Sequence, residues 1–407
     1  MKTSNLRWKF LAVIAAMAAS LAAVKAASTT VIYSFGGEDD GEYADTDLAV
    51  DSAGNLYGTT VTGGDFGGGT VFQLSPTENG WVHTVLYSFT GGADGGEPYK
   101  GVTLDAKGNL YGTAVTGGSG NCEGGCGVAY KLAKSGSAWK QKVIHAFTGG
   151  DDGAGPGARL TVDRRGNLYG MAPIGGEFGF GTIYQISPAG GGQYALQVLH
   201  SFTGGADGAT GSAGQMVLRH GRLYGVATAG GSFGKGAAFE LTRAQGGDWS
   251  FKTIYSFKGQ PDAGFPYGGL LFDAAGNLYG TTYYDGANNL GSVYELSPRP
   301  TGEWAETVLY SFTAGKDGNS SIGNLVFDPA GNLYGTTSEG GLSGIGTIFK
   351  LTNNSGVWTE SVVHSFRGPP DGAFAYNGMV VDNAGNFYGA TVHGGADDEG
   401  AIYKFQP

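Results

Sequence analysis

The sequence predicts an all-β protein, a seven-bladed β-propeller of four-stranded antiparallel blades. Two observations lead to this fold. First, the segment Leu278-Tyr279-Gly280-Thr281-Thr282 recurs along the chain, and a fixed period of this length is typical of repeat architectures. Second, the two ends of the chain carry complementary parts of one repeat. The signature tyrosines are spaced 54, 58, 55, 55, 55 and 54 residues apart, at Tyr57, Tyr111, Tyr169, Tyr224, Tyr279, Tyr334 and Tyr388.

One repeat, from Gly269 to Phe312, contains four segments with strand character and none with helical periodicity. The first two are joined by Asp273-Ala274-Ala275-Gly276-Asn277, a turn in which Asp can bond the backbone and Gly supplies positive φ. The fourth is rich in residues that favour strands. Four antiparallel strands in about 55 residues suit a propeller blade or a solenoid rung. The expected strands are 270–272, 278–282, 292–296 and 304–312.

The chain ends favour the propeller over the solenoid. Residues 27–35 resemble a fourth strand without the preceding three, and Ala401–Phe405 resembles a third strand without a fourth. A closed ring would join both fragments in one blade and leave no exposed sheet edge. We therefore expect a single domain over 27–407, with blade seven formed by about 375–407 plus 27–35.

The first 26 residues differ from the repeats. Lys2, Arg7 and Lys9 precede an apolar run over 10–24, and small residues follow near Ala26. This pattern predicts a signal peptide over 1–26, with an N-terminal membrane anchor as the alternative. We expect a secreted or periplasmic protein that does not remain inserted in a membrane after cleavage.

Charge and cysteine content limit the partners and the compartment. The chain carries a net charge of −11, and loss of residues 1–26 removes four basic residues, which takes the charge to −15. An acidic surface argues against nucleic acid. Cys122 and Cys126 lie in the loop of one repeat only, so in an exported protein we expect a local disulfide. A metal site is the alternative, but no histidine is near.

Residues that every blade carries are best explained by blade construction. Five blades carry a tryptophan eight residues before the fourth-strand phenylalanine, a sixth carries Tyr194 there, and these residues are expected to pack at blade edges. The tryptophans are Trp81, Trp139, Trp249, Trp304 and Trp358. Aspartates five residues after that phenylalanine are expected to form turns, and a ring of carboxylates that binds calcium is the alternative. These are Asp40, Asp94, Asp152, Asp207, Asp262, Asp317 and Asp371. The strand-one-to-two turns also carry aspartate, except in blade four, which has Leu218-Arg219-His220-Gly221-Arg222.

Candidate functional residues are those at which blades differ. Tyr284, Glu339 and His393 occupy one repeat position in three successive blades, five residues after the signature tyrosine. Tyr99, Tyr267 and Tyr376 lie ten residues after the fourth-strand phenylalanine and are expected at the central mouth. Tyr267 and Tyr376 belong to the same sector as Tyr284, Glu339 and His393. Aromatic, acidic and imidazole groups at such a mouth suit a sugar or a peptide. Ordinary loop variation is the alternative interpretation.

The repeat resembles a known family through the pattern G-N-L-Y-G-T-T, then G-G, then G-T-V-F-Q-L-S-P and V-L-Y-S-F-T-G-G-A-D-G. This pattern is similar to the GloVer tandem repeat of bacterial extracellular proteins, and the resemblance covers essentially all of the chain after residue 26. It implies an exported bacterial protein of a group with varied anchoring devices, and it implies no activity. The Gly-Gly doublet also gives a looser likeness to kelch-type propellers.

Three function classes follow. The sequence favours a monomeric, non-catalytic module without a cofactor that binds a glycan, peptide or protein through its loop face. The first alternative is a propeller lyase or lactonase with a metal at the central mouth, but Glu339 and His393 supply two ligands where three are usual. The second alternative is a structural or adhesive cell-surface protein. No nucleophile elbow, phosphate loop or dinucleotide fingerprint occurs.

Overall fold

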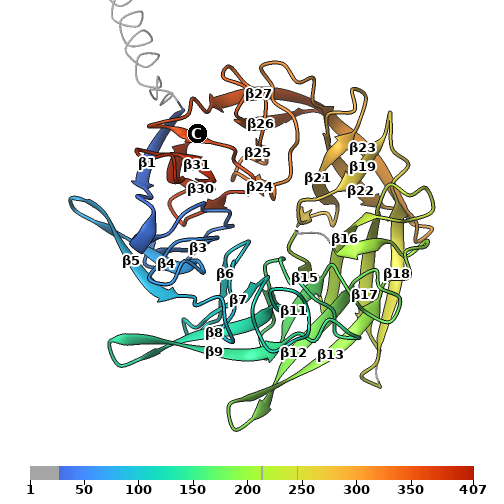
Figure 1. Ribbon diagram of the computed structural model, residues 1–407. Helices are drawn as coiled ribbons and strands as arrows, with labels where there is room; N and C mark the ends of the chain where they lie inside the picture. The colour runs from blue at the N-terminus through green and yellow to red at the C-terminus, as the bar shows by residue number, and fades with distance from the viewer. Residues whose placement is uncertain (1–26, 212–213, 245) are drawn as a thin grey trace, which may run out of the picture.

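A computed structural model describes residues 27–407 except 212–213 and 245. Seven antiparallel sheets of four or five strands surround a common centre as the blades of a propeller (Figure 1), and two short strands of the described chain form a separate small sheet. The all-β, seven-bladed prediction is confirmed. The predicted signal peptide, residues 1–26, lies outside the described residues. Within the part that is described, no helix is both long and apolar enough to cross a bilayer.

The blades are numbered by their signature tyrosines, and their strands run from the centre outward. Blade one has β2 (Ala49–Val50), β3 (Leu56–Thr60), β4 (Thr70–Thr77) and β5 (Gly80–Ser88); blade two has β6 (Val102–Leu104), β7 (Leu110–Ala114), β8 (Val128–Ser135) and β9 (Ala138–Ala146). Blade three has β10 (Thr161–Val162), β11 (Leu168–Ala172), β12 (Thr182–Gly190) and β13 (Gln193–Ser201). Blade four has β15 (Val217–Arg219), β16 (Arg222–Ala229), β17 (Ala237–Arg243) and β18 (Trp249–Ser256).

Blade five has β20 (Leu271–Phe272), β21 (Leu278–Asp285), β22 (Ser292–Pro298) and β23 (Trp304–Ser311); blade six has β24 (Val326–Phe327), β25 (Leu333–Thr337), β26 (Thr347–Asn354) and β27 (Val357–Ser365). Blade seven has β29 (Val380–Val381), β30 (Phe387–Thr391), β32 (Ala401–Gln406) and β1 (Ser28–Ser34). Short segments not expected from the sequence lie in the inter-blade connections: η1 (Glu38–Asp40), β14 (Ala209–Gly211), β19 (Ala263–Pro266) and β28 (Gly372–Ala373). A further short strand, β31 (His393–Gly394), lies in the loop between β30 and β32 of blade seven and pairs with β28.

The N-terminal strand closes the ring, as predicted. Strand β1 pairs with β32 from Ser28 opposite Gln406 to Ser34 opposite Ala401. The next residue, Phe35, is fully buried in a cluster that also contains Phe72 of blade one. The strand therefore completes blade seven and supplies part of its contact with blade one.

The signature glycine is explained by close packing inside each blade. Gly280 lies opposite Tyr294 on the neighbouring strand β22, and a Cβ at Gly280 would lie 2.6 Å from Cζ of Tyr294. Gly58 has the same relation to Phe72, and its Cβ would lie 2.5 Å from Cζ. Any larger residue would displace a fully buried aromatic ring.

Tryptophans of the outer strands pack between blades. Trp358 of blade six lies edge-on to Tyr279, the signature tyrosine of blade five, with ring centroids 6.2 Å apart. Trp249 of blade four has the same relation to Tyr169 of blade three, at 5.8 Å. The predicted packing role of these residues agrees with this geometry.

The two ends of the ring differ in their connections. The loops between second and third strands and the inter-blade connections lie on one side, which we name the loop face. The turns between first and second strands and between third and fourth strands lie on the other side, which we name the hairpin face. An antiparallel up-and-down blade requires this alternation.

Candidate functional site

The three repeat-breaking residues occupy equivalent backbone positions on the loop face. Each pairs with the preceding inter-blade connection: Tyr284 with Gly264, Glu339 with Asn319, and His393 with Ala373. The same pairing joins Thr62 to Glu42 in blade one. Blade geometry therefore presents one side chain per blade at this position.

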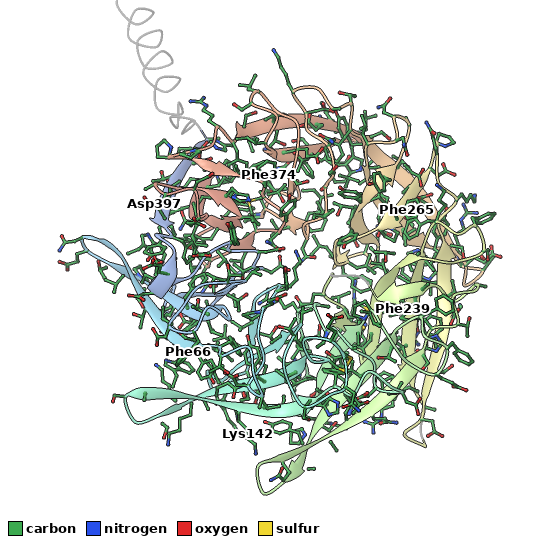
Figure 2. All side chains as sticks on the ribbon, viewed as in Figure 1. Phe66, Lys142, Phe239, Phe265, Phe374 and Asp397 are labelled. Carbon is green, nitrogen blue, oxygen red and sulfur yellow. A yellow bond between two sulfur atoms is a disulfide. The ribbon has the colours of Figure 1, made fainter. Side chains whose placement is uncertain are left out.

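Tyrosines of blade five form the first part of the site. Tyr284 contacts Tyr283 edge-on, with ring centroids 4.3 Å apart, and Tyr283 lies 6.2 Å from Tyr267. Tyr284 is 48% exposed and Tyr267 is 37% exposed. Phe265 of β19, labelled in Figure 2, lies 6.0 Å from Tyr284. The predicted Tyr267 and Tyr284 thus belong to one exposed aromatic group.

Glu339 lies between this group and blade seven. Its carboxylate accepts a hydrogen bond from Asn319 Nδ2 at 2.9 Å. Burial raises the pKa of Tyr283, and the carboxylate of Glu339 raises it further. The pKa of Tyr376 is raised by burial and by the negative charges of Asp45 and Glu339. Glu339 therefore acts electrostatically on tyrosines of two different blades.

His393 faces blade one and not blade five. Its ring lies 5.2 Å from Tyr43 and 5.7 Å from Phe374, edge-on in both cases, and Nδ1 lies 3.3 Å from the carbonyl oxygen of Asp398. Phe374 also stacks on Tyr376 at 6.3 Å. The five predicted residues thus form an arc around the mouth, and Tyr284 and His393 lie at its two ends.

A cavity of about 370 Å³ lies beside His393. Of the five predicted residues only His393 lines it, together with Tyr43, Asp45, Val61, Tyr99 and Val392. Counting eight residues after the fourth-strand phenylalanine would have indicated Tyr43, because Phe265 and Phe374 occupy that same repeat position. Tyr43, Phe265 and Phe374 all have positive φ.

A buried polar network supports the floor of the mouth. Lys100 Nζ lies 2.6 Å from Asp45 Oδ1 and donates to Asn377 Oδ1 at 3.0 Å, and Asn377 Nδ2 donates to the same Asp45 oxygen at 2.8 Å. Burial alone would lower the pKa of Lys100, but the carboxylates of Asp45 and Asp47 raise it. Lys100 is therefore a permanent cation whose charge is balanced within the ring.

Beneath this network Asp47 accepts hydrogen bonds from Asn324 Nδ2 at 3.0 Å and from the backbone N–H of Gly378 at 3.1 Å. Burial raises the pKa of Asp47, while Lys100 and Arg159 act in the opposite direction. These contacts join blades one, six and seven near the axis. They hold the mouth residues on a rigid base.

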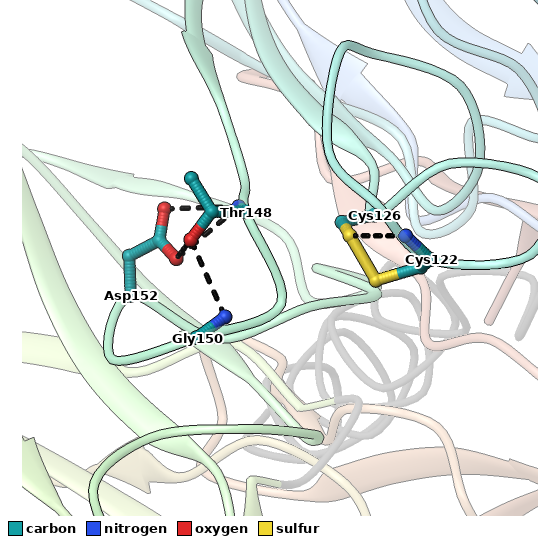
Figure 3. The surroundings of a disulfide bond; sticks show 5 residues. All are labelled: Cys122, Cys126, Thr148, Gly150 and Asp152. Carbon is teal, nitrogen blue, oxygen red and sulfur yellow. Dashed lines mark hydrogen bonds between the residues drawn. A yellow bond between two sulfur atoms is a disulfide. The ribbon is translucent and has the colours of Figure 1, made fainter.

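Cys122 and Cys126 form a disulfide with sulfur atoms 2.00 Å apart. Figure 3 shows the bond beside the inter-blade turn in which Asp152 accepts a hydrogen bond from Thr148 N at 3.1 Å. A Cβ on Gly149 would lie 2.7 Å from Cys122 Sγ. The disulfide therefore constrains the loop of blade two against the next connection.

Five of the seven recurring aspartates accept backbone hydrogen bonds in the turn, as expected: Asp40, Asp94, Asp152, Asp207 and Asp317. Asp317, for example, accepts hydrogen bonds from Thr313 N at 2.8 Å and Tyr310 OH at 2.8 Å. Asp262 and Asp371 accept none from the backbone within the described residues, so the expectation does not hold for these two. Among residues 27–407, apart from the three that are not described, no group of three or more His, Cys, Asp or Glu side chains is arranged to hold a metal ion.

Several solved structures are similar to this chain. One, from Thermus thermophilus and provisionally assigned as an oxidoreductase (glucose dehydrogenase), is 15% identical over 93% of this chain and 100% of that chain, with a TM-score of 0.47. A protein of unknown function from Dyadobacter fermentans is 12% identical over 93% and 97%, with a TM-score of 0.47. A calcium structure of a Trichoderma reesei carbohydrate-active enzyme of family AA12 is 14% identical over 94% and 96%, with a TM-score of 0.45.

No curated protein matches the sequence. The profile of the Gloeobacter/Verrucomicrobia repeat matches residues 20–222 and 212–407, which together include all seven blades. The chain belongs to the Gloeobacter/Verrucomicrobia repeat family.

Proposed function

We propose that this protein is an exported, non-catalytic glycan-binding propeller whose site lies at the loop-face mouth, between blades seven, one and two. The observation that carries the proposal is the cavity of about 370 Å³ that Tyr43, Tyr99 and His393 line together with Asp45. Sugar-sized ligands need aromatic faces for their C–H surfaces and polar groups for their hydroxyls.

The carboxylate of Asp45, on the polar side of the cavity, is held in one orientation by its neighbours. The bonds from Lys100 and Asn377 both end on Oδ1 of Asp45, so Oδ2 remains to accept a bond from a sugar hydroxyl. Because the ion pair with Lys100 fixes the carboxylate, a ligand would lose little free energy in ordering it. The aromatic group of Tyr267 and Tyr284 would then bind further sugar units along the arc.

A glycan array on the purified protein, followed by calorimetric titration of the best ligand, tests this proposal. Tyr99→Ala and His393→Ala are expected to weaken binding about tenfold each, a change of about 1.4 kcal/mol. The matched control is Phe178→Ala, which removes a ring that is 49% exposed on the loop of blade three. Unchanged affinity in both cavity variants would disprove the proposed position.

Ligand length gives a second test. Tyr284 lies at the far end of the arc from the cavity. The variant Tyr284→Ala should therefore weaken binding of an oligosaccharide and leave binding of a single sugar unchanged. Equal weakening for both ligands would show that the arc is not an extended site.

A further inference from the structure

Basic residues gather on the hairpin face of blades three and four. Six of the nine arginines in the sequence lie between positions 159 and 243, although the chain as a whole has a net charge of −11. Arg164 and Arg165 form the turn between β10 and β11, Arg219 and Arg222 flank the turn between β15 and β16, and Arg243 ends β17. The distribution of arginine is thus strongly uneven.

Blade construction does not require these arginines. At the two positions occupied by Arg164 and Arg165, the other blades with this turn carry Ser52-Ala53, Ala106-Lys107, Ala274-Ala275, Pro329-Ala330 and Asn383-Ala384. Blade four alone replaces the turn aspartate with arginine, at Arg219. The repeats therefore act as an internal control, and they show that small neutral residues are enough for the turn.

The arginines border a groove of about 620 Å³ between blades three and four. Arg164, Arg165, His220 and Arg243 line it, together with the aromatic rings of Tyr169 and Trp249. Arg164 also lines the central cavity of about 490 Å³. His220 also lines a hollow of about 480 Å³ beside Arg219 and Arg222. The groove therefore shares lining residues with both neighbouring hollows.

Two carboxylates nearby are already bonded, and one of them, Asp163, lines the groove itself. Glu240 lies 2.6 Å from Arg222, and the Asp163 carboxylate accepts bonds from Asn167 and from the backbone N–H of Arg165. Within the described chain no ion pair joins Arg164, Arg165 or Arg243 to a carboxylate. These three side chains are exposed. They present guanidinium groups whose charge is not balanced by a direct partner.

We propose that this groove, defined by Arg164, Arg165, His220 and Arg243, binds an acidic oligosaccharide through its carboxylate or sulfate groups. The planar guanidinium fork bonds such anions in pairs, and the half-buried ring of Trp249 supplies a surface for the sugar. A long polyphosphate fits less well, because it would extend beyond the groove onto an acidic surface. This site lies on the opposite face from the mouth and does not depend on the function proposed above.

The test titrates the purified protein with hexagalacturonate, with a sulfated heparin hexasaccharide and with neutral maltohexaose. We expect at least one of the two acidic probes to bind. Its affinity should fall as the salt concentration rises, since exposed charges are screened over about 10 Å at 0.1 M ionic strength. Comparison of the two acidic probes distinguishes carboxylate from sulfate recognition. Binding of maltohexaose with equal affinity would overturn the proposal.

Arg165→Ala combined with Arg243→Ala is expected to reduce affinity for the acidic probe at least about tenfold. The matched control is Arg299→Ala combined with Arg367→Ala, which removes the same charge from exposed positions on blade five and on the connection after blade six. The control should retain affinity. Equal loss in both variants, or a loss below about twofold in the groove variant, would contradict the groove as the site.

Alanine already stands at the Arg165 position in four other blades and Arg243 is exposed, so we expect the groove variant to fold with an unchanged melting temperature. The variant's binding can then be compared directly with that of the native protein. Tighter binding of a short DNA duplex than of either acidic oligosaccharide would also overturn the ligand class proposed here.

Discussion

His145 Nε2 lies 2.9 Å from Oδ2 of Asp152, and this contact joins the outer strand of blade two to the connection that follows it. Histidine and tyrosine both make the contact. The equivalent pairs are His200–Asp207 at 3.0 Å, His364–Asp371 at 3.0 Å, Tyr33–Asp40 at 2.6 Å, Tyr87–Asp94 at 2.9 Å and Tyr310–Asp317 at 2.8 Å. Blade four differs, because Tyr255 donates to Glu306 of the next blade at 2.9 Å.

Asp317→Ala should therefore destabilise the protein more than Asp262→Ala. The Asp317 carboxylate accepts bonds from Tyr310 and Thr313, whereas in the described structure no side-chain hydrogen bond ends on Asp262. We expect Asp317→Ala to lower the free energy of unfolding by about 1–3 kcal/mol, the cost of leaving donors unpaired. Denaturant unfolding of the two variants checks this. Equal losses, or a loss that added calcium reverses, would contradict the turn interpretation.

Glu360 should make stability depend on pH. Its Oε1 is buried without a hydrogen-bond partner in the described structure, and burial, with the charge of Asp317, raises its pKa from 4.5 to about 7. The folded state then binds a proton more tightly than the unfolded state. Its contribution to stability is full below pH 4.5 and is lost as pH rises to about 7.

Glu360→Gln is expected to remove that part of the pH dependence. Urea unfolding between about pH 4 and pH 8 should show a smaller fall in stability for the variant than for the native protein. The control is Glu78→Gln, which changes an exposed glutamate in the β4–β5 turn and should follow the native curve. Parallel curves for Glu360→Gln and the native protein would show that Glu360 is not the cause.

Gly280→Ala should be strongly destabilising. The new Cβ would lie 2.6 Å from Cζ of buried Tyr294, and a displaced core ring costs about 1–3 kcal/mol or more. Gly157→Ala is the matched control, because the nearest atom to its Cβ, in Val115, lies 3.6 Å away. Thermal unfolding should separate the two variants by several degrees, and similar melting temperatures would show that the Gly280 contact relaxes freely.

Deletion of residues 27–35 tests closure of the ring. The deletion removes β1 from its partner β32 and also removes Phe35, which is fully buried. Loss of a buried phenylalanine alone costs about 3–5 kcal/mol, so the truncated protein should melt far below the native one. A truncated protein with the native melting temperature would contradict closure by this strand.

Much of the fold follows from the sequence, because its determinants are local and repeated. The turn at Asp273 bonds its own neighbours, Asn277 and Tyr279, and Gly280 accommodates a ring from the same blade. The number of times that the signature segment recurs gives the number of blades. The short strands β14, β19 and β28 could not be predicted, because each forms only where an inter-blade connection meets the second strand or, for β28, the loop after it.

The sequence by itself determined seven blades, closure by residues 27–35 and the sector of the ring in which each variable residue lies. Only the tertiary structure decided which neighbours those residues meet. His393 faces Tyr43 because ring closure brings blade seven against blade one, and Arg243 borders the same groove as Arg164 because adjacent blades pack side by side. A repeat period fixes each residue's place within its own blade, whereas a binding site is formed between blades, by contacts that the period does not specify.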